Sequence, residues 1–259
     1  MLHELHRQLP SERLLYVADL AWFPYGPRPL AEVRRRALEI VEHLVQRDTK
    51  LVVIACNSAS AAALNAARER FDIPVVGVIS PGAVAAAAAT RIGRVAVLST
   101  QATLESNEYV HAIKEANPGV VVLGRAAPEL VDIVESGEAD SDRADDSLRT
   151  VLEEVFAWGA DTLVLGCTHY PLLLPSLRRV IGMRDITVID SAATTAARVR
   201  RIIATNRLQR GTRRNTAPEL TVTAAPRRFL ESARRIFGED LAAPQLVVVG
   251  RAAPLAVAT

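Results

Sequence analysis

The stretch Leu51-Val-Val-Ile-Ala-Cys56-Asn57-Ser58 decides the fold, and Leu163-Val-Leu-Gly-Cys167-Thr168-His169 repeats its pattern further along the chain. In each, a short apolar run ends at a cysteine that small polar residues follow. Continuous apolar runs are typical of parallel strands that helices cover on both faces. Because ligands bind at the carboxyl ends of such strands, we expect each cysteine to lie at a binding edge.

These two cysteines are the only ones in the 259 residues. A single free cysteine often does no more than fill space in a core. Two thiols at equivalent positions of two similar segments favour chemistry instead, because one can act as a base and the other as an acid on one substrate. The sequence therefore predicts two thiols that face a shared site.

Apolar runs of strand length alternate with helix-length segments almost throughout the chain, which predicts an α/β fold with parallel sheets. Ser58 or Ser60 is expected to cap the Ala-rich helix that follows the first cysteine. The expected strands are 14–18, 51–55, 75–79, 95–99, 120–123, 162–166, 187–189, 220–223 and 246–249, and the expected helices are 31–46, 59–70, 103–116, 142–158, 192–204 and 226–237.

Two segments, 77–94 and 190–195, are candidate crossings between domains. They predict two pseudo-symmetric parallel-sheet α/β domains with the active site in the cleft between them. The first domain would be discontinuous, formed by 1–78 plus 191–259, and the second would be 79–190. Each domain would then contain one cysteine.

Composition excludes several other classes of function. Hydrophobic residues make up 49% and charged residues 23% of the chain, and the net charge is +2. We therefore expect a globular protein with no nucleic-acid or membrane partner. The N-terminus lacks the apolar core of a signal peptide, so two distant free thiols indicate a cytoplasmic protein. The five histidines show no metal-ligand spacing with each other or with the cysteines, and no metal site is expected.

The beginning of the sequence departs from the usual doubly wound pattern. It opens with Leu2, Leu5 and Leu9 at helical spacing, followed by Pro10 and a strand. Doubly wound domains commonly open with a strand whose following loop contributes to the site. We expect the first strand of the first domain to be missing from this sequence.

Three motifs together resemble the glutamate racemase family, within the aspartate/glutamate racemase superfamily. They are Ala-Cys56-Asn57-Ser58-Ala-Ser60, Leu-Gly-Cys167-Thr168-His169-Tyr170-Pro171-Leu172-Leu173 and Phe23-Pro24-Tyr25-Gly26. The similarity runs in order from residue 2 to about residue 238. It also includes Ser99-Thr100-Gln-Ala-Thr103, the segment from Pro128 to Glu135, and Val188-Ile-Asp190-Ser191-Ala.

The resemblance implies an isomerase that interconverts L- and D-glutamate without a cofactor and supplies D-glutamate for peptidoglycan. Cys56 and Cys167 would be its catalytic acid and base, and His169, two residues past the second cysteine, would assist Cys167. A thiol has an ordinary pKa of about 8.5 and reacts as the thiolate. Each cysteine therefore needs a polar neighbour to bring that pKa to the working pH.

The resemblance also implies the residues that bind substrate. Asn57, Ser58 and Thr168 would hold the α-amino and α-carboxylate groups. Tyr25 and Gly26 would line the same cleft, with Thr100 and Thr103 in its wall.

The family begins with a strand and an Asp-Ser-Gly-x-Gly-Gly loop, and the present sequence starts after that motif. In the family this Asp helps the first cysteine. We therefore expect a start placed too far downstream or a truncated chain, with low stability and low activity as written. Asp19 lies in a later segment and is not assigned that role.

Two alternatives remain open at this point. An aspartate racemase-type enzyme usually has Glu after its second Cys-Thr, so His169 favours glutamate. A catalytically impaired racemase-like binding protein is favoured only by the missing N-terminal motif. The sequence leaves open whether the chain forms a homodimer.

Overall fold

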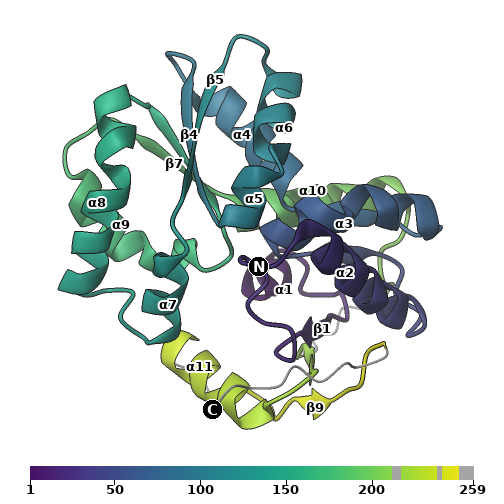
Figure 1. Ribbon diagram of the computed structural model, residues 1–259. Coiled ribbons are helices and arrows are strands. Elements are labelled where there is room, and N and C mark those ends of the chain that lie inside the picture. Colours follow the sequence, from purple (N-terminus) through teal and green to yellow (C-terminus); the bar gives the residue numbers. More distant parts are fainter. Residues whose placement is uncertain (212–216, 238–240, 251–259) are drawn as a thin grey trace.

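The computed structural model describes residues 1–211, 217–237 and 241–250. Its best-ordered layer is a four-stranded parallel sheet in the order β5-β4-β6-β7. These strands are β5 (Val121–Ala126), β4 (Arg94–Ser99), β6 (Thr162–Gly166) and β7 (Thr187–Asp190). Figure 1 shows α8 (Asp142–Trp158) and α9 (Leu174–Ile181) on one face, and α4 (Ile79–Ala89) and α6 (Glu108–Ala116) on the other.

Strand β6 explains why this sheet is buried on both faces. Leu163 and Leu165 pack into the core under α8 and α9, whereas Val164 between them packs into the core under α4 and α6. Successive side chains of a strand point to opposite faces, so an unbroken apolar run fills both cores. The strand ends at Gly166, directly before Cys167.

The remaining strands form two smaller parallel sheets. In one, β1 (Leu15–Ala18) pairs with β8 (Glu219–Val222), which pairs in turn with β9 (Gln245–Leu246). In the other, β2 (Val52–Ile54) pairs with β3 (Val75–Gly77). Helices α2 (Leu30–Val45) and α3 (Asn57–Arg70) cover β2, and α1 (Leu2–Gln8) and α10 (Ser191–Thr205) pack beside β3.

A cavity of about 390 Å³ separates the two small sheets. Its walls include Leu14–Tyr16 from the β1 side, Leu51–Val53 from the β2 side, and Leu5 from α1. Strand β1 is paired only with β8, and β2 only with β3, so neither described strand has a partner on the edge that faces the cavity. Among the described residues, the two small sheets are therefore not joined by backbone pairing.

Two expectations about helices are wrong. The expected helix 103–116 is two helices, α5 (Gln101–Glu105) and α6, because Asn107 between them has a φ of 57° in the left-handed region. Helix α3 has Cys56 as its N-cap residue, rather than Ser58 or Ser60. The Ser60 hydroxyl instead donates a hydrogen bond to the carbonyl of Ile54, 2.8 Å away.

The last elements lie at the lower edge of Figure 1, where α11 (Pro226–Phe237) runs close to α7 (Glu129–Glu135). The expected strand 246–249 is shorter in the structure, since β9 ends at Leu246. The expected domain segment 191–259 also includes 212–216, 238–240 and 251–259, which lie outside the described residues.

Candidate active site

The two cysteines occupy matching places in the fold. Cys56 follows β2 and is the N-cap of α3. Cys167 follows β6 and precedes a short 3-10 helix, Tyr170–Leu173. Both thiols are free. Each therefore lies at the carboxyl end of a parallel strand, the edge at which α/β proteins bind ligands.

Opposing influences act on the Cys56 thiol. Burial raises its pKa, the backbone N–H groups of Ala59 and Ser58 lower it, and negative charge on Cys167 raises it. The two thiols are thus close enough for the charge of one to oppose ionisation of the other. On balance these influences leave the pKa of Cys56 above its ordinary value.

A chain of polar contacts leads away from Cys167. Its Sγ lies 3.8 Å from Nδ1 of His169, and Nε2 of the same ring lies 2.9 Å from Oε1 of Glu135 on α7. Burial opposes a charge on His169, but the contacts with Cys167 and Glu135 outweigh it and raise the pKa from 6.5 to about 9. The hydrogen bond with His169 in turn lowers the pKa of Glu135. His169 is therefore held as an imidazolium beside the thiol.

Glu135 is a residue of this site that sequence reasoning missed. It lies within a quoted motif, but its partner is 34 residues away along the chain. Its other oxygen, Oε2, accepts a hydrogen bond of 3.5 Å from Ser232 on α11. The Phe23 ring also lies close to His169, with 6.0 Å between the ring centres. The segment that carries Tyr25 therefore reaches the histidine that lies beside Cys167.

Three of the expected binding residues form one buried hydroxyl cluster. The Ser58 Oγ lies 2.9 Å from Thr100 Oγ1 and 3.3 Å from Thr103 Oγ1, and the two threonine oxygens are 3.1 Å apart. Ser58 belongs to α3. Thr100 is the N-cap of α5, directly after β4, and Thr103 lies within α5. The cluster thus joins the Cys56 segment to the four-stranded sheet.

Asn57 is 2% exposed, and its Oδ1 accepts a hydrogen bond of 2.8 Å from the Tyr109 hydroxyl. Its Nδ2 has no partner among the described residues. A buried amide donor without a partner is costly, so Nδ2 is available for an acceptor on a ligand. Tyr109 lies outside the motifs that resemble the racemase family.

Tyr25 and Gly26 are placed differently from each other. A Cβ on Gly26 would lie 3.2 Å from Cβ of Thr100, so the backbone of this segment packs directly on the hydroxyl cluster. The Tyr25 hydroxyl instead donates a hydrogen bond of 2.5 Å to Asp19 Oδ2. Burial and the charge of Asp19 both raise the pKa of Tyr25, which keeps its hydroxyl protonated.

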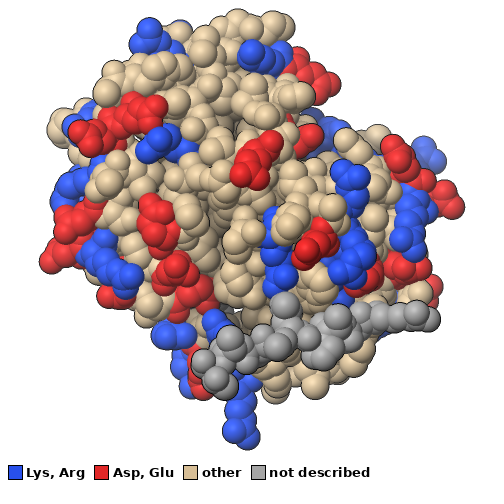
Figure 2. Space-filling model, in the orientation of Figure 1, with Lys and Arg blue, Asp and Glu red and all other residues tan. Residues whose placement is uncertain are grey.

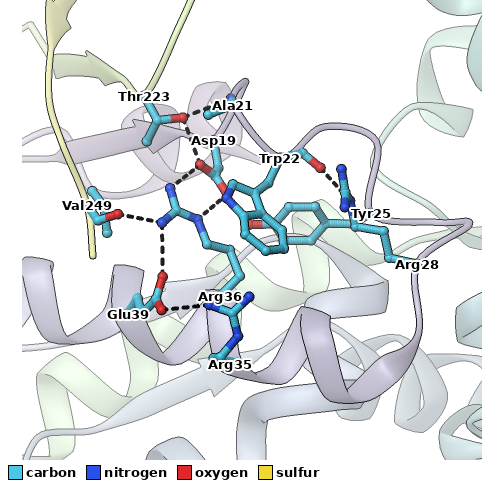
Figure 3. Close-up of polar contacts among 10 residues, drawn as sticks. All are labelled: Asp19, Ala21, Trp22, Tyr25, Arg28, Arg35, Arg36, Glu39, Thr223 and Val249. Carbon is cyan, nitrogen blue, oxygen red and sulfur yellow. Dashed lines mark hydrogen bonds and ion pairs between the residues drawn. The ribbon is translucent and has the colours of Figure 1, made fainter. Parts of the chain in front are cut away.

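Figure 3 shows that Asp19 belongs to a buried ion pair. Arg36 donates to both of its oxygens, at 2.7 and 2.9 Å, and Thr223 donates to Oδ1 at 2.7 Å. Burial alone raises the pKa of Asp19, but these donors together with Tyr25 hold it below its ordinary value. Both carboxylate oxygens of Asp19 therefore have protein partners, and they hold the loop that carries Tyr25 in place.

Thr168 is exposed, and its Oγ1 lies 3.5 Å from Nδ1 of His169. Within the described ranges, no group of three or more potential metal ligands is present. No helix of those ranges is long and apolar enough to span a membrane. On the face that Figure 2 shows, acidic and basic side chains are interspersed.

The fold and the two thiols define an α/β protein with a free cysteine after each of two parallel strands. The family model for Asp/Glu/hydantoin racemases matches residues 1–199, and the chain belongs to that family. The expectation of an amino-acid racemase, an isomerase, is thereby confirmed. A glutamate racemase of Geobacter metallireducens is 44% identical over 241 residues, which cover 93% of this chain and 89% of that protein.

A second curated relative, a glutamate racemase of Saccharopolyspora erythraea, is 44% identical over 236 residues, or 91% of this chain and 86% of that protein. Among solved structures, a glutamate racemase isoform of Bacillus anthracis superposes with a TM-score of 0.89 at 35% identity, covering 96% of this chain and 92% of its own. A glutamate racemase of Francisella tularensis, solved in complex with D-glutamate, gives 0.86 at 26% identity with the same coverage. The expected α/β fold is confirmed.

The Glu135–His169 contact predicts a change in pH dependence. In Glu135→Gln the carboxylate that supports the imidazolium is lost, so the pKa of His169 falls from about 9 toward 6.5. The stability that the raised pKa contributes is present in full below about pH 6.5 and is lost as the pH rises through about 9, so a variant without the contact should show less of this loss. The alkaline limb of kcat/KM should move to lower pH, measured together with an NMR titration of His169.

Glu129→Gln is the matched control, because Glu129 begins the same helix, is exposed and makes no contact with His169. The control should keep the pH profile of the unsubstituted chain. An unchanged profile in Glu135→Gln would show that Glu135 does not set the protonation of His169.

Proposed function

We propose that this chain interconverts L- and D-glutamate without a cofactor, by proton exchange at the α-carbon between Cys56 and Cys167. The observation that carries the proposal is the placement of two free thiols at equivalent strand ends, each with its own polar support. The relatives named glutamate racemase support glutamate as the substrate. His169 also favours glutamate over an aspartate racemase-type activity.

The chemistry balances with these groups alone. One cysteine, as thiolate, takes the α-proton from its face of the substrate, and the bond's electron pair stays on the α-carbon and its carboxylate. The other cysteine, as thiol, gives a proton to the opposite face and becomes the thiolate. The enzyme then holds the reverse charge state, ready for the opposite enantiomer. Cys56 and Cys167 therefore exchange roles with the direction of reaction.

Binding and chemistry fall to different residues. The free Nδ2 of Asn57, the hydroxyl of Ser58 and the exposed Thr168 are the proposed contacts to the α-carboxylate and α-ammonium groups. His169 supports the thiolate of Cys167 through its charge. The N-terminal N–H groups of α3 do the same for Cys56.

We propose that two domains, 1–78 with 191–259 and 79–190, enclose the site in the cleft between them. The membership of the strands supports this division, because β1, β2, β3, β8 and β9 fall in the first range and the four-stranded sheet falls in the second. In this proposal the protein acts in the cytoplasm and supplies D-glutamate for peptidoglycan.

The cavity between β1 and β2 supports a further part of the proposal. Two parallel strands with unpaired edges face each other across about 390 Å³, and Met1 and Leu5 line the same space. We propose that the cavity takes one parallel strand joined ahead of α1, which would complete a β-α-β unit with β1. Its following loop would carry the carboxylate that activates Cys56, as the resemblance implies.

An extension that places an apolar strand and an Asp-Ser-Gly-Ala-Gly-Gly loop ahead of Met1 should raise both stability and activity. The added strand pairs two exposed edges and fills the cavity, so the melting temperature should rise by about 5 °C or more. Racemase activity of the purified protein should rise as well. The same extension with Asn in place of its Asp is the control, and it should raise the melting temperature with little gain in activity.

Full activity of the unextended chain, or no change in melting temperature on extension, would contradict the strand proposal. Full activity of the unextended chain would mean that another group activates Cys56, and the racemase proposal would stand.

Cys56→Ser and Cys167→Ser should each reduce racemisation by about 10²–10⁴-fold, since a serine hydroxyl is far too weak an acid to replace a thiol. We would follow each enantiomer in deuterated water with the extended protein. The two variants should differ in the enantiomer whose α-proton they still exchange. Near-normal racemisation by either variant would rule out the two-thiol mechanism.

A further inference from the structure

Tyr109, on α6, is buried beside both cysteine segments although it lies far from them in the sequence. Its side chain is 3% exposed. The hydroxyl donates a hydrogen bond of 2.8 Å to Oδ1 of Asn57, the residue that follows Cys56. Burial and nearby charge on Cys167 raise the pKa of Tyr109, so the hydroxyl stays a donor at every physiological pH. The Oδ1 of Asn57 therefore keeps this donor as its partner.

That hydrogen bond decides which way the Asn57 amide faces. With Oδ1 bound to Tyr109, Nδ2 is directed elsewhere, and it is the atom without a partner among the described residues. Rotating the amide by half a turn would place its N–H₂ group against the Tyr109 hydroxyl, so that oxygen would have to accept and its O–H would lose its acceptor on Asn57. The tyrosine therefore presents Asn57 as a donor, which suits a carboxylate of the substrate.

The ring of Tyr109 contacts the other cysteine segment. A Cβ on Gly166, directly before Cys167, would lie 3.1 Å from Cε2 of the ring and 3.0 Å from the carbonyl oxygen of Leu98. Glycine is thus needed at 166 because the ring lies directly against the backbone there. The hydroxyl lies above Gly82 of α4, since a Cβ on Gly82 would be 3.6 Å from it.

We propose that Tyr109 is a positioning residue for the racemase reaction, which orients the Asn57 amide toward the substrate and sets it relative to Cys167. It needs no contact with the thiols or the substrate. Its ring fixes the distance between the two segments, and its hydroxyl fixes the direction of the amide. This inference rests on the proposed function, because it assigns the role by the reaction that Asn57 and Cys167 serve.

Tyr109→Phe keeps the ring on Gly166 and removes the hydroxyl. We expect KM for both enantiomers to rise by about tenfold or more, because the buried Asn57 loses its partner and its orientation. The kcat should change less. In Asn57→Ala the same substitution should add almost nothing to KM, because the two residues act through one contact.

A second readout does not depend on catalysis. In the ¹⁵N–¹H spectrum of the unsubstituted chain, the side-chain amide signals of Asn57 should be sharp, and they should shift and broaden in Tyr109→Phe. The control is Tyr170→Phe, which removes another buried tyrosine hydroxyl that donates to the backbone carbonyls of Ser99 and Ala127. It should reduce stability and leave both KM and the Asn57 signals unchanged.

The positioning role is overturned if Tyr109→Phe leaves KM and the Asn57 signals unchanged, if Tyr170→Phe raises KM equally, or if the effects of Tyr109→Phe and Asn57→Ala on KM multiply. If the unsubstituted chain neither binds nor racemises glutamate, the proposed function fails, and the Asn57 signals still decide whether Tyr109 orients that amide.

Discussion

Buried side-chain hydrogen bonds join the segment that follows Cys56 to the four-stranded sheet whose strand β6 leads to Cys167. No strand of the four-stranded sheet pairs with β1 or β2 among the described residues, so no backbone ladder fixes Cys56 relative to Cys167. The hydroxyl cluster of Ser58, Thr100 and Thr103 spans this gap. Buried polar groups without partners are costly, so the hydroxyls favour the arrangement in which the sheets approach. The rest of the site depends on that approach.

The two thiols differ in the groups that surround them. Cys56 receives backbone N–H groups at the start of α3, but burial and the charge of Cys167 oppose its ionisation. Cys167 faces an imidazolium that Glu135 supports from α7. The surroundings of the two thiols therefore differ, with a helix N-terminus at Cys56 and a side-chain charge at Cys167. In the proposed reaction the pair holds one proton between them.

Much of the fold could be predicted because its determinants are local. Strand β6 follows Thr162–Gly166 as the apolar run indicates, and α8 and α11 span the expected residues. Local pattern fails at Asn107, where helical spacing continues across a left-handed residue. It also overextends the last strand, since the run of valines continues past the last hydrogen bond to β8, which Val247 donates to Val222.

The sequence predicted those residues of the candidate site that lie in recognisable motifs. Both cysteines and His169 follow strands that the sequence makes plain. Glu135 and Tyr109 meet their partners across 34 and 52 residues, and no periodicity encodes such contacts. The sequence assigned no role to Asp19, which forms an ion pair with Arg36 in the structure. Because a charged helix residue is ordinarily expected to be exposed, the sequence did not indicate that Arg36 is buried.

A structure of this chain with D-glutamate bound would show directly whether the two thiols face one substrate. We predict that the α-carbon lies between the Sγ atoms of Cys56 and Cys167, with the two sulfur atoms on opposite faces and Nδ2 of Asn57 against a carboxylate oxygen. Glutamate bound with both sulfur atoms on one face of the α-carbon, or bound away from the two thiols, would contradict it.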